Sequence, residues 1–534
     1  MLKADLLAGL TIALMVLPQG VAYAALAGMP LVTGIYAAFL PGLVAALWGS
    51  STRLSVGPTA LTCLLIGSSL APLATPGSAL WVQLAVWLAL MSGAMQLLLG
   101  VGRFGWLLNL VSSPVLTGFT QGAALLILWS QVPKLLGLGR PAVSLEVFSS
   151  LHGAAAAFGL GSLATLLLMK RWKPSFPSTI AVVGASAAIS YALGAQQSGT
   201  PIVGALPAGL PAFTLPTVLP WPMMDKLLLP AMVITLVSYL ETASSARREH
   251  ELAGTRWNEN QDLIAQGLAK LVSAICGAFP TSTSFSRAAI SLQAGALTGW
   301  ATVVCTAIIG LALLVLMPTL YFVPQSVLAG VVVAAVAGLV KPDFLFKLWR
   351  ISKMETATAA ITFALTLYSA PNLYWGVLAG LLISLSHFLY HRLHPRIIEV
   401  GLHPDGSLRD RHLWNLPILA PNLYALRMDA ELDFASASGF GAAIDQHLTK
   451  FPATRYVCLF AQPINRIDVT GVEAFVELRR SLTARGICLY ISGIKLPVET
   501  ALERAGALAP GPHLHLFRTD PDALAALSKL GQTV

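Results

Sequence analysis

Charged residues are scarce in this chain. Only 11% of its 534 residues are Asp, Glu, Lys or Arg, whereas 56% are hydrophobic and the mean hydropathy is +0.73. A soluble domain carries about 25% charged residues, so this chain has too few to cover a solvated surface. The shortage argues against a soluble enzyme, a nucleic-acid-binding protein and a disordered interaction hub. The composition therefore predicts an integral membrane protein.

Cysteine is also scarce, and the motifs of several enzyme classes are missing. The five cysteines show neither CxxC nor metal-ligand spacing, which predicts core packing rather than a disulfide framework or a metal site. No nucleotide-binding motif accompanies the hydrophobic segments, and no nucleophile lies in a pattern with a base. We therefore predict no catalytic residue, no metal and no cofactor, apart from Na⁺ or H⁺ as a coupling ion.

The charge that is present divides the chain in two. Residues 401–534 contain 13 Lys or Arg and 13 Asp or Glu, so the formal excess of +9 lies entirely in the first 400 residues. A basic excess in hydrophobic sequence is typical of cytoplasmic loops that follow the positive-inside rule. The change in composition predicts a transmembrane domain at residues 1–398 and a second domain at residues 399–534.

Long hydrophobic runs fill the first domain. A membrane-spanning helix needs about 20 apolar residues, and twelve windows reach or approach this length. They lie at 5–28, 31–49, 79–101, 112–131, 156–171, 177–194, 227–247, 258–277, 298–317, 322–340, 354–370 and 372–393. Two further segments, 55–71 and 280–294, are short and open with SVGPTA and PTSTSFSR. Counting both gives an all-α polytopic protein with fourteen transmembrane segments.

The order of these segments predicts internal symmetry. Seven segments precede about residue 200 and seven follow it, and an odd number per repeat forces the second repeat to be inverted in the membrane. The broken segments are the third element of each half, and matched broken segments are the best sequence indication of a transporter's central site. Most Lys and Arg residues lie in alternate loops, which places the N-terminus and the second domain in the cytoplasm.

The second domain has a different pattern. LYALRM, RYVCLFA and ICLYIS are typical of buried strands, and they alternate with helical stretches at 437–449, 471–485 and 498–506. Alternation of strands and helices predicts a small α/β domain. It contains no Gly-rich phosphate loop and no pair of carboxylates at a catalytic spacing.

The two broken segments predict an anion site. Each would present the amide groups of a helix N-terminus at mid-membrane, where unpaired N–H groups and the helix dipole attract negative charge. Thr59, Ser284 and Ser286 add hydroxyl donors there, and Arg287 lies within one turn of the second helix start. An intramembrane Arg indicates function by default, although it could also be a snorkelling cation that sets the topology.

Two other polar residues lie inside predicted spans. Glu241 follows a long apolar run, and a buried carboxylate needs a proton, a cation or a partner such as Arg287. It is a candidate site for H⁺ or Na⁺, or half of a structural pair. Gln19 lies in the middle of the first span and either donates to a substrate or bridges helices.

Several motifs together closely resemble one family. LPQGVAYAALAGMPLVTGIYAAFLPGLVAALWGSS, TRLSVGPTALTCLLIG, LVSYLETASSAR and NQDLIAQGLAKLVSAICGAFPTSTSFSRAAISLQAGA resemble the sulfate permease family of anion transporters. INRIDVTGVEAF resembles the loop of that family's cytoplasmic STAS domain. The resemblance runs in order from about residue 3 to the C-terminus.

The resemblance implies more than the residues alone do. It implies a core domain that moves against a gate domain, usually in a homodimer, in the inner (plasma) membrane of the cell. It assigns anion binding to residues of four segments: Gln19, Gly57, Thr59, Ala60, Glu241, Ser284, Phe285, Ser286 and Arg287. It assigns the STAS loop to Asp468, Thr470 and Gly471.

Two positions depart from the family pattern. Some bacterial relatives have a proton-coupling carboxylate where this chain has Gln19, so proton coupling here would depend on Glu241. The STAS loop has Val469 where stand-alone relatives have a phosphorylatable Ser, so we interpret Thr470 as a helix N-cap. A scaffolding or dimerisation role is the main interpretation of this domain, and a cytoplasmic protein partner is a further hypothesis.

The function predicted from the sequence is secondary active anion transport, with sulfate as the first candidate. Bicarbonate, chloride or a C4-dicarboxylate are alternatives on the same fold. A nucleobase carrier shares the inverted architecture, but Arg287 favours an anion over a neutral base. A membrane sensor that signals through its STAS domain is the alternative from another class. The predicted partners are therefore the anion, the lipid bilayer and a second copy of the chain, without nucleic acid.

Overall fold

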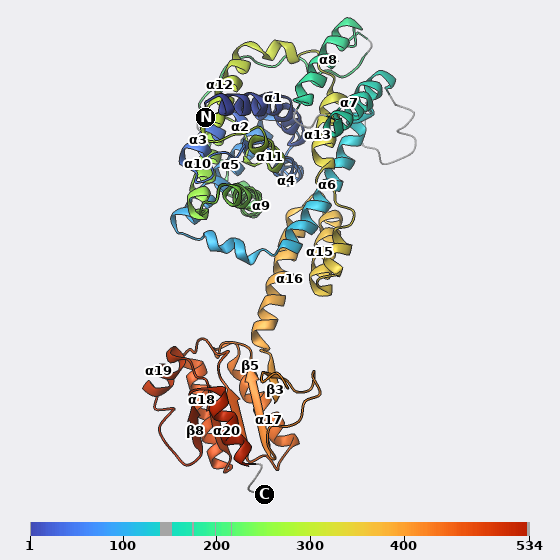
Figure 1. Cartoon of the computed structure of the whole chain (residues 1–534). Coiled ribbons are helices and arrows are strands. Elements are labelled where there is room, and N and C mark those ends of the chain that lie inside the picture. The colour runs from blue at the N-terminus through green and yellow to red at the C-terminus, as the bar shows by residue number, and fades with distance from the viewer. Residues whose placement is uncertain (1, 139–151, 173–175, 198, 215, 531–534) are drawn as a thin grey trace. The chain divides into compact units, whose positions relative to one another are not determined.

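The computed structural model describes residues 2–138, 152–172, 176–197, 199–214 and 216–530. The chain forms two compact units, residues 1–384 and 385–534, here called the N-terminal and the C-terminal unit. The division falls inside one long helix, α16, whereas the boundary predicted from composition, 398/399, lies within the strand that follows it. Figure 1 shows a helical N-terminal unit and a C-terminal unit that contains a sheet.

The N-terminal unit is built almost entirely of helices. In chain order its elements are α1 Leu2–Leu26, α2 Thr33–Ala38, α3 Leu40–Trp48, β1 Val56–Gly57, α4 Ala60–Leu70, α5 Ala79–Val101, η1 Gly105–Leu110, α6 Ser113–Leu135, α7 Gly153–Trp172, α8 Ser178–Ala192, α9 Trp221–Ala253, α10 Glu259–Ile275, β2 Ser282–Thr283, α11 Phe285–Gln293, α12 Trp300–Val315, η3 Met317–Leu320, α13 Gln325–Ala337, α14 Phe344–Trp349, α15 Lys353–Tyr368 and α16 Tyr374–Leu393.

Several of these helices have the length of a bilayer. Among the described residues, α1, α5, α6, α7 and α9 are long and apolar enough to cross a membrane. Five further apolar helical segments of 10–17 residues accompany them, and one of these, Thr33–Trp48, is broken at Phe39 into α2 and α3. The predicted run 31–49 is therefore not one continuous helix. The count of fourteen segments stays a prediction.

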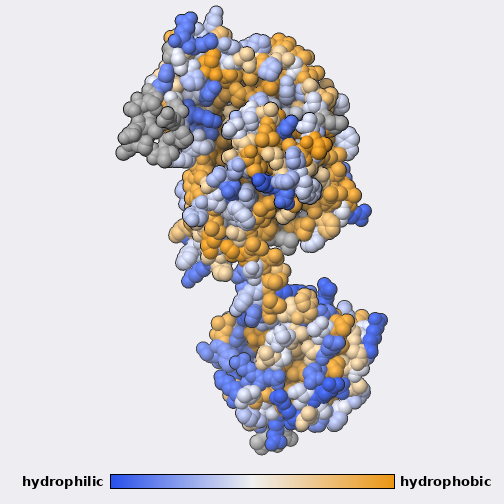
Figure 2. Space-filling view, turned by 180° about the vertical axis from the view of Figure 1, so that it is seen from behind, coloured by the Kyte–Doolittle hydropathy of each residue, from blue (hydrophilic) through white to orange (hydrophobic). Residues whose placement is uncertain are grey.

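The hydrophobic surface agrees with a membrane environment. Figure 2 shows hydrophobic side chains over much of the visible face of the N-terminal unit, while the C-terminal unit carries many hydrophilic ones. Large side chains such as Leu98, Trp129 and Leu168 are more than half exposed, as lipid-facing residues would be. The two units thus present surfaces suited to different solvents.

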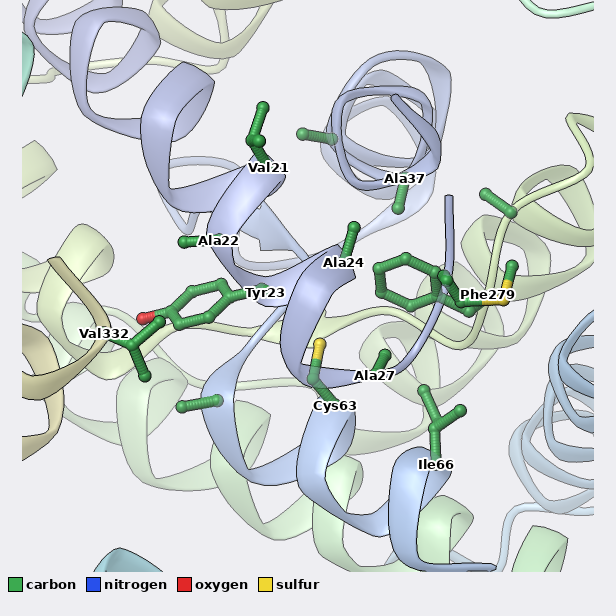
Figure 3. Close-up of a cluster of buried hydrophobic side chains, with 14 of the residues drawn as sticks. Val21, Ala22, Tyr23, Ala24, Ala27, Ala37, Cys63, Ile66, Phe279 and Val332 are labelled. Atoms are coloured by element: carbon green, nitrogen blue, oxygen red, sulfur yellow. The ribbon is translucent and has the colours of Figure 1, made fainter. Parts of the chain in front are cut away.

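The core of the N-terminal unit gathers around α1. Val21, Ala22 and Ala24 of this helix pack against Cys63 and Ile66 of α4, as Figure 3 shows. Small residues let these backbones approach closely, which is the usual way in which helices pack in membranes. Helices α1 and α4 are therefore held as neighbours, and the start of α4 lies in the interior.

The C-terminal unit is an α/β domain. Its elements are β3 Ile397–Leu402, β4 Leu408–Asp410, β5 Leu423–Met428, α17 Ala437–Lys450, β6 Tyr456–Phe460, α18 Val469–Ala484, β7 Cys488–Ser492, α19 Leu496–Arg504, β8 Leu514–Phe517 and α20 Asp520–Leu530. The sheet order is β4-β3-β5-β6-β7-β8. Strands β5 to β8 are parallel, and β3 is antiparallel to both of its neighbours.

Alternation along the strands gives this sheet two buried faces. Leu426 packs on one face with Phe440 of α17 and Phe475 of α18. Ala425, the preceding residue, packs on the other face with Leu527 of α20. Successive side chains of a strand point to opposite faces, so short continuous apolar runs such as LYALRM can fill both layers. The three strands and three helices predicted in this region are confirmed.

Candidate functional site

Two short strands bring the two broken segments together. Strand β1 pairs antiparallel with β2, with Val56 opposite Thr283 and Gly57 opposite Ser282. Helix α4 begins at Ala60 and α11 begins at Phe285, each two or three residues after its strand. The strand pairing therefore holds the N-termini of two helices beside each other in the interior of the unit. Their unpaired amide groups form a region of positive potential.

Hydroxyl side chains cap both helix starts. Thr59 is the N-cap of α4 and its Oγ1 accepts from the amide of Thr62 at 3.4 Å. Ser284 is the N-cap of α11 and its Oγ accepts from the amide of Arg287 at 3.5 Å. Both side chains are buried, whereas Ser286, whose Oγ lies 3.3 Å from that of Ser284, is exposed. The predicted hydroxyl donors lie at the helix starts.

Glu241 of α9 lies directly against this region. Its side chain is buried, and its Oε2 accepts hydrogen bonds from three hydroxyls: Thr59 at 3.2 Å, Thr62 at 3.5 Å and Ser282 at 2.5 Å. These donors are the N-cap of α4, a residue of its first turn and a residue of β2, so the carboxylate bridges both broken segments. Hydroxyl groups are neutral, so these contacts do not compensate the negative charge of an ionised carboxylate.

Arg287 is the third residue of α11 and is 1% exposed. Its Nε donates to Ser55 Oγ at 3.1 Å and its Nη1 donates to Gln19 Oε1 at 3.4 Å. Its Nη2 is buried and has no hydrogen-bond partner among the residues that the structure describes. A Cβ placed on Gly57 would lie 3.4 Å from that Nη2, so glycine leaves the space beside the guanidinium open. A buried donor without a partner is costly and indicates a place for an acceptor.

The sequence left open whether Glu241 and Arg287 form a direct ion pair, and the described residues show no such pair. No ion pair joins Glu241 and Arg287 in the part of the chain that the structure describes, since each carries its own set of neutral partners. Gln19 bridges to Arg287 and thus connects α1 to α11. The polar side chains of the site therefore form two groups, one around Glu241 and one around Arg287.

A small cavity of about 40 Å³ lies between the helix starts. Its lining includes six residues predicted from the sequence: Thr59, Ala60, Glu241, Ser284, Phe285 and Ser286. Gly57, Gln19 and Arg287 do not line it but form the adjacent layer. The structure thus places all nine predicted positions in one region, although they do not all face one space.

Two residues of this region were missed in the sequence. Tyr23 of α1 lines the cavity, and its hydroxyl points toward Val332 in Figure 3. Lys270 of α10 is fully buried and donates to Gln96 and Ser238. An ionisable residue inside a predicted span, 258–277, was the signal for Lys270. Tyr23 gave no such signal, because an aromatic residue in an apolar helix is ordinary.

The STAS loop requires one correction. Asp468, not Thr470, is the N-cap of α18: its Oδ1 accepts from the amide of Gly471 at 2.8 Å. Its Oδ2 accepts from the amide of Phe434 at 2.9 Å and ties the loop to a neighbouring segment. Thr470 is the second residue of the helix and is exposed. Asp468 has extended backbone, with φ −105° and ψ −177°, directly before the first helical residue, so its carboxylate can accept from the free amides of the first turn.

Metal and disulfide sites were not expected, and the described residues contain no group of three His, Cys, Asp or Glu that could hold a metal ion. All five cysteines are free, and four of them are buried. Their surroundings agree with the packing role inferred from sequence, as Cys63 illustrates in the core beside α1.

Comparison with known proteins bears on both units. The Sulfate permease family profile matches residues 2–362, and the STAS domain profile matches residues 419–523. Probable sulfate transporter 4.2 of Arabidopsis thaliana is 34% identical over 537 residues, which cover 94% of this chain and 78% of that protein. A probable sulfate transporter of Mycobacterium tuberculosis is 30% identical over 542 residues, covering 99% and 96%.

Two solved structures share the fold. The murine Solute Carrier 26 family member A9 anion transporter in the inward-facing state matches with a TM-score of 0.86 at 22% identity, covering 99% of this chain and 91% of that one. The transmembrane domain of a cyanobacterium bicarbonate transporter matches with a TM-score of 0.63 at 21% identity, covering 71% and 97%. These similarities establish the architecture.

Proposed function

Because the chain belongs to the sulfate permease family, we propose that it is a secondary active anion transporter whose substrate is sulfate. The fold is that of a multi-pass membrane transporter, and the relatives described above are named as sulfate transporters. We further propose that transport proceeds by elevator-like alternating access, with the anion held between the N-termini of α4 and α11.

One observation carries the anion site. The strand pair β1–β2 sets two helix N-termini side by side, and a buried guanidinium beside them has an N–H donor without a partner in the described part of the chain. An anion with several acceptor oxygens could accept hydrogen bonds from that donor and from amides and hydroxyls of both helices. A neutral nucleobase would leave the charge of Arg287 uncompensated, which argues against the alternative of a nucleobase carrier.

We propose sulfate before the other anions because the relatives are named as sulfate transporters. Bicarbonate is the second candidate, because a bicarbonate transporter shares the fold of the N-terminal unit. Chloride and C4-dicarboxylates follow, with no feature of the structure in their favour. A sensor that binds an anion without moving it would use the same site, and only a transport measurement separates it from a carrier.

The coupling ion is proposed to act at Glu241. Protonation would remove a buried negative charge next to the anion, and Na⁺ would compensate it with oxygen ligands. The three hydroxyls on Oε2 connect this carboxylate to both broken segments, so its charge state can influence both helix starts. In either form, binding of the cation favours binding of the anion.

The remaining expectations complete the proposal. We propose fourteen segments in two inverted repeats that form a core and a gate domain, and a homodimer in the plasma (inner) membrane. The N-terminus and the STAS domain would lie in the cytoplasm, where the STAS domain scaffolds the dimer or binds a protein partner.

Reconstitution into liposomes tests this function. Purified protein would be offered a panel of labelled anions, each with and without an inward proton or sodium gradient. We expect saturable sulfate uptake that unlabelled sulfate inhibits and that one of the two gradients drives uphill. Uptake of bicarbonate, chloride or a dicarboxylate in preference to sulfate would change the substrate. Absence of uptake and exchange for every anion, in protein that remains monodisperse, would contradict a transport function.

A further inference from the structure

A second buried cation lies behind Glu241. Lys270 of α10 has no exposed surface and is among the largest fully buried side chains of the described chain. Its Nζ donates to Gln96 Oε1 of α5 and, at 2.5 Å, to Ser238 Oγ of α9. Gln96 Nε2 in turn donates to Ser238 Oγ at 3.3 Å, which closes a triangle around the ammonium group. The lysine of α10 is therefore held by side chains of two other helices, α5 and α9.

The partners of Lys270 are neutral. Within the described ranges, no carboxylate lies within ion-pair distance of its Nζ. The amide and hydroxyl oxygens can accept from an ammonium, which is a donor only, but they cannot cancel its charge. A buried charge without a counter-charge is expensive and persists when the function uses it.

A short polar connection leads from Lys270 to Glu241. Ser238 and Glu241 are three residues apart on α9 and so lie on the same side of that helix. The hydroxyl oxygen of Ser282 lies 3.3 Å from the carbonyl oxygen of Ser238 and 2.5 Å from Glu241 Oε2. The lysine and the carboxylate are thus separated by one serine on α9 and one on β2, and their charges act on the same interior region.

Three ionisable side chains are buried in this part of the unit: Lys270, Arg287 and Glu241. We propose that Lys270 is the second fixed positive charge of the site and that it determines the valence of the transported anion. With Glu241 protonated, the two cations balance a divalent anion. With Glu241 ionised, one positive charge remains and balances a monovalent anion.

This inference rests on the proposed function and adds a rule to it. A divalent anion such as sulfate is carried together with one proton, taken up by Glu241 from the side on which the anion binds, whereas a monovalent anion is carried without one. Lys270 touches no substrate in this scheme. It is a positioning residue that acts through the electric field of its charge, in a region of low dielectric constant.

The test compares labelled sulfate with labelled chloride in proteoliposomes. Lys270→Met removes the charge and keeps the length of the side chain, Lys270→Arg keeps the charge, and Lys226→Met removes an exposed lysine of the same unit as a matched control. We expect the ratio of sulfate to chloride uptake to fall at least about tenfold in Lys270→Met. The ratio should recover in Lys270→Arg and stay unchanged in Lys226→Met.

Proton dependence gives a second readout that a merely structural role would not move. An inward proton gradient should stimulate sulfate but not chloride uptake by the unmodified protein. In Lys270→Met it should stimulate chloride uptake, because one cation and a protonated Glu241 then balance a monovalent anion. An unchanged ratio together with an unchanged proton dependence in Lys270→Met would overturn the inference.

The unmodified protein provides a test that does not depend on folding of the variant. Counting protons per anion with a pH-sensitive dye should give about one for sulfate and about none for chloride, from the charge balance above. Equal proton counts for the two anions would overturn the valence rule while leaving anion transport intact. A protein that moves neither anion would instead overturn the proposed function.

Discussion

Several charged side chains of the two units have different surroundings. In the C-terminal unit they lie at the surface and pair directly with one another, as Arg392 does with Glu431 at 2.7 Å and Arg427 with Asp429 at 2.7 Å. In the interior of the N-terminal unit, Glu241, Lys270 and Arg287 are nearly or fully buried and bind neutral hydroxyls and amides instead.

The difference separates structural charges from functional ones. An exposed ion pair contributes about 0–1 kcal/mol, so the pairs of the C-terminal unit matter mainly for solubility. A buried charge without a counter-charge costs several kcal/mol, and Glu241, Lys270 and Arg287 are three such groups of the described residues near the two helix starts. Changes to buried charges should therefore alter transport, whereas changes to the C-terminal unit should alter stability.

The largest expected effect comes from Arg287→Ala. Loss of the guanidinium removes the unpaired donor and the charge at the start of α11, so sulfate uptake should fall about 100-fold or more. Arg287→Lys should rescue it only partly, because a point charge lacks the planar fork. Arg248→Ala, an exposed arginine of α9, is the control. Normal uptake by folded Arg287→Ala protein would remove Arg287 from the site.

Glu241→Gln should separate coupling from binding. Glutamine keeps the size and an acceptor oxygen for the three hydroxyls but has no titratable charge. We expect gradient-driven accumulation of the anion to be lost while exchange of internal for external anion persists. Uphill uptake is measured with and without the gradient in the same liposomes. Full gradient-driven uptake would show that the coupling ion binds elsewhere.

Part of the site that these two predictions concern could be predicted from the sequence. Pro58 and Pro280, next to hydroxyl residues, marked the breaks that precede α4 and α11, so both helix starts were predictable. The partners of Arg287 were not, because its bonds to Ser55 and Gln19 join segments far apart in the chain. Lys270 carried a signal, an ionisable residue inside a predicted span, but its partners on α5 and α9 could not be predicted from the sequence.

The C-terminal fold shows the same division between local and long-range information. Apolar runs predicted β5, β6 and β7, since buried parallel strands are continuous in hydrophobicity. Strands β3, β4 and β8 are short or half exposed and were not predicted. The N-cap was assigned to Thr470 instead of Asp468 because both residues are good caps, and only the backbone path decides between them.

Gly471→Ala should destabilise the C-terminal unit and spare the anion site. A Cβ at this position would lie 2.1 Å from the carbonyl oxygen of Leu432, so the backbone has to move. We expect a loss of about 1–3 kcal/mol in unfolding free energy, read as a lower melting temperature. Gly441→Ala on α17, where a Cβ meets nothing within 4 Å, is the control and should be neutral or stabilising. A change in anion preference in Gly471→Ala would break the division between the units.

The smallest expected effect is a pH dependence at His447. Its ring stacks on Tyr424 with centroids 3.6 Å apart, and partial burial lowers the pKa of the imidazole. The folded unit therefore prefers the neutral ring, so stability is fully present above the ordinary pKa near 6.5 and declines as the pH falls below it. Melting of the C-terminal unit between pH 7.5 and 5.5 should shift less in His447→Phe. An equal shift in both proteins would assign the pH dependence to other groups.

The most direct test of the central claim, that an anion binds between α4 and α11, is sulfate counterflow. Liposomes loaded with unlabelled sulfate are diluted into a trace of labelled sulfate, with no proton or sodium gradient present. The account predicts transient accumulation of label by the unmodified protein and by Glu241→Gln, and none by folded Arg287→Ala. Equal counterflow by Arg287→Ala and the unmodified protein would contradict the claim.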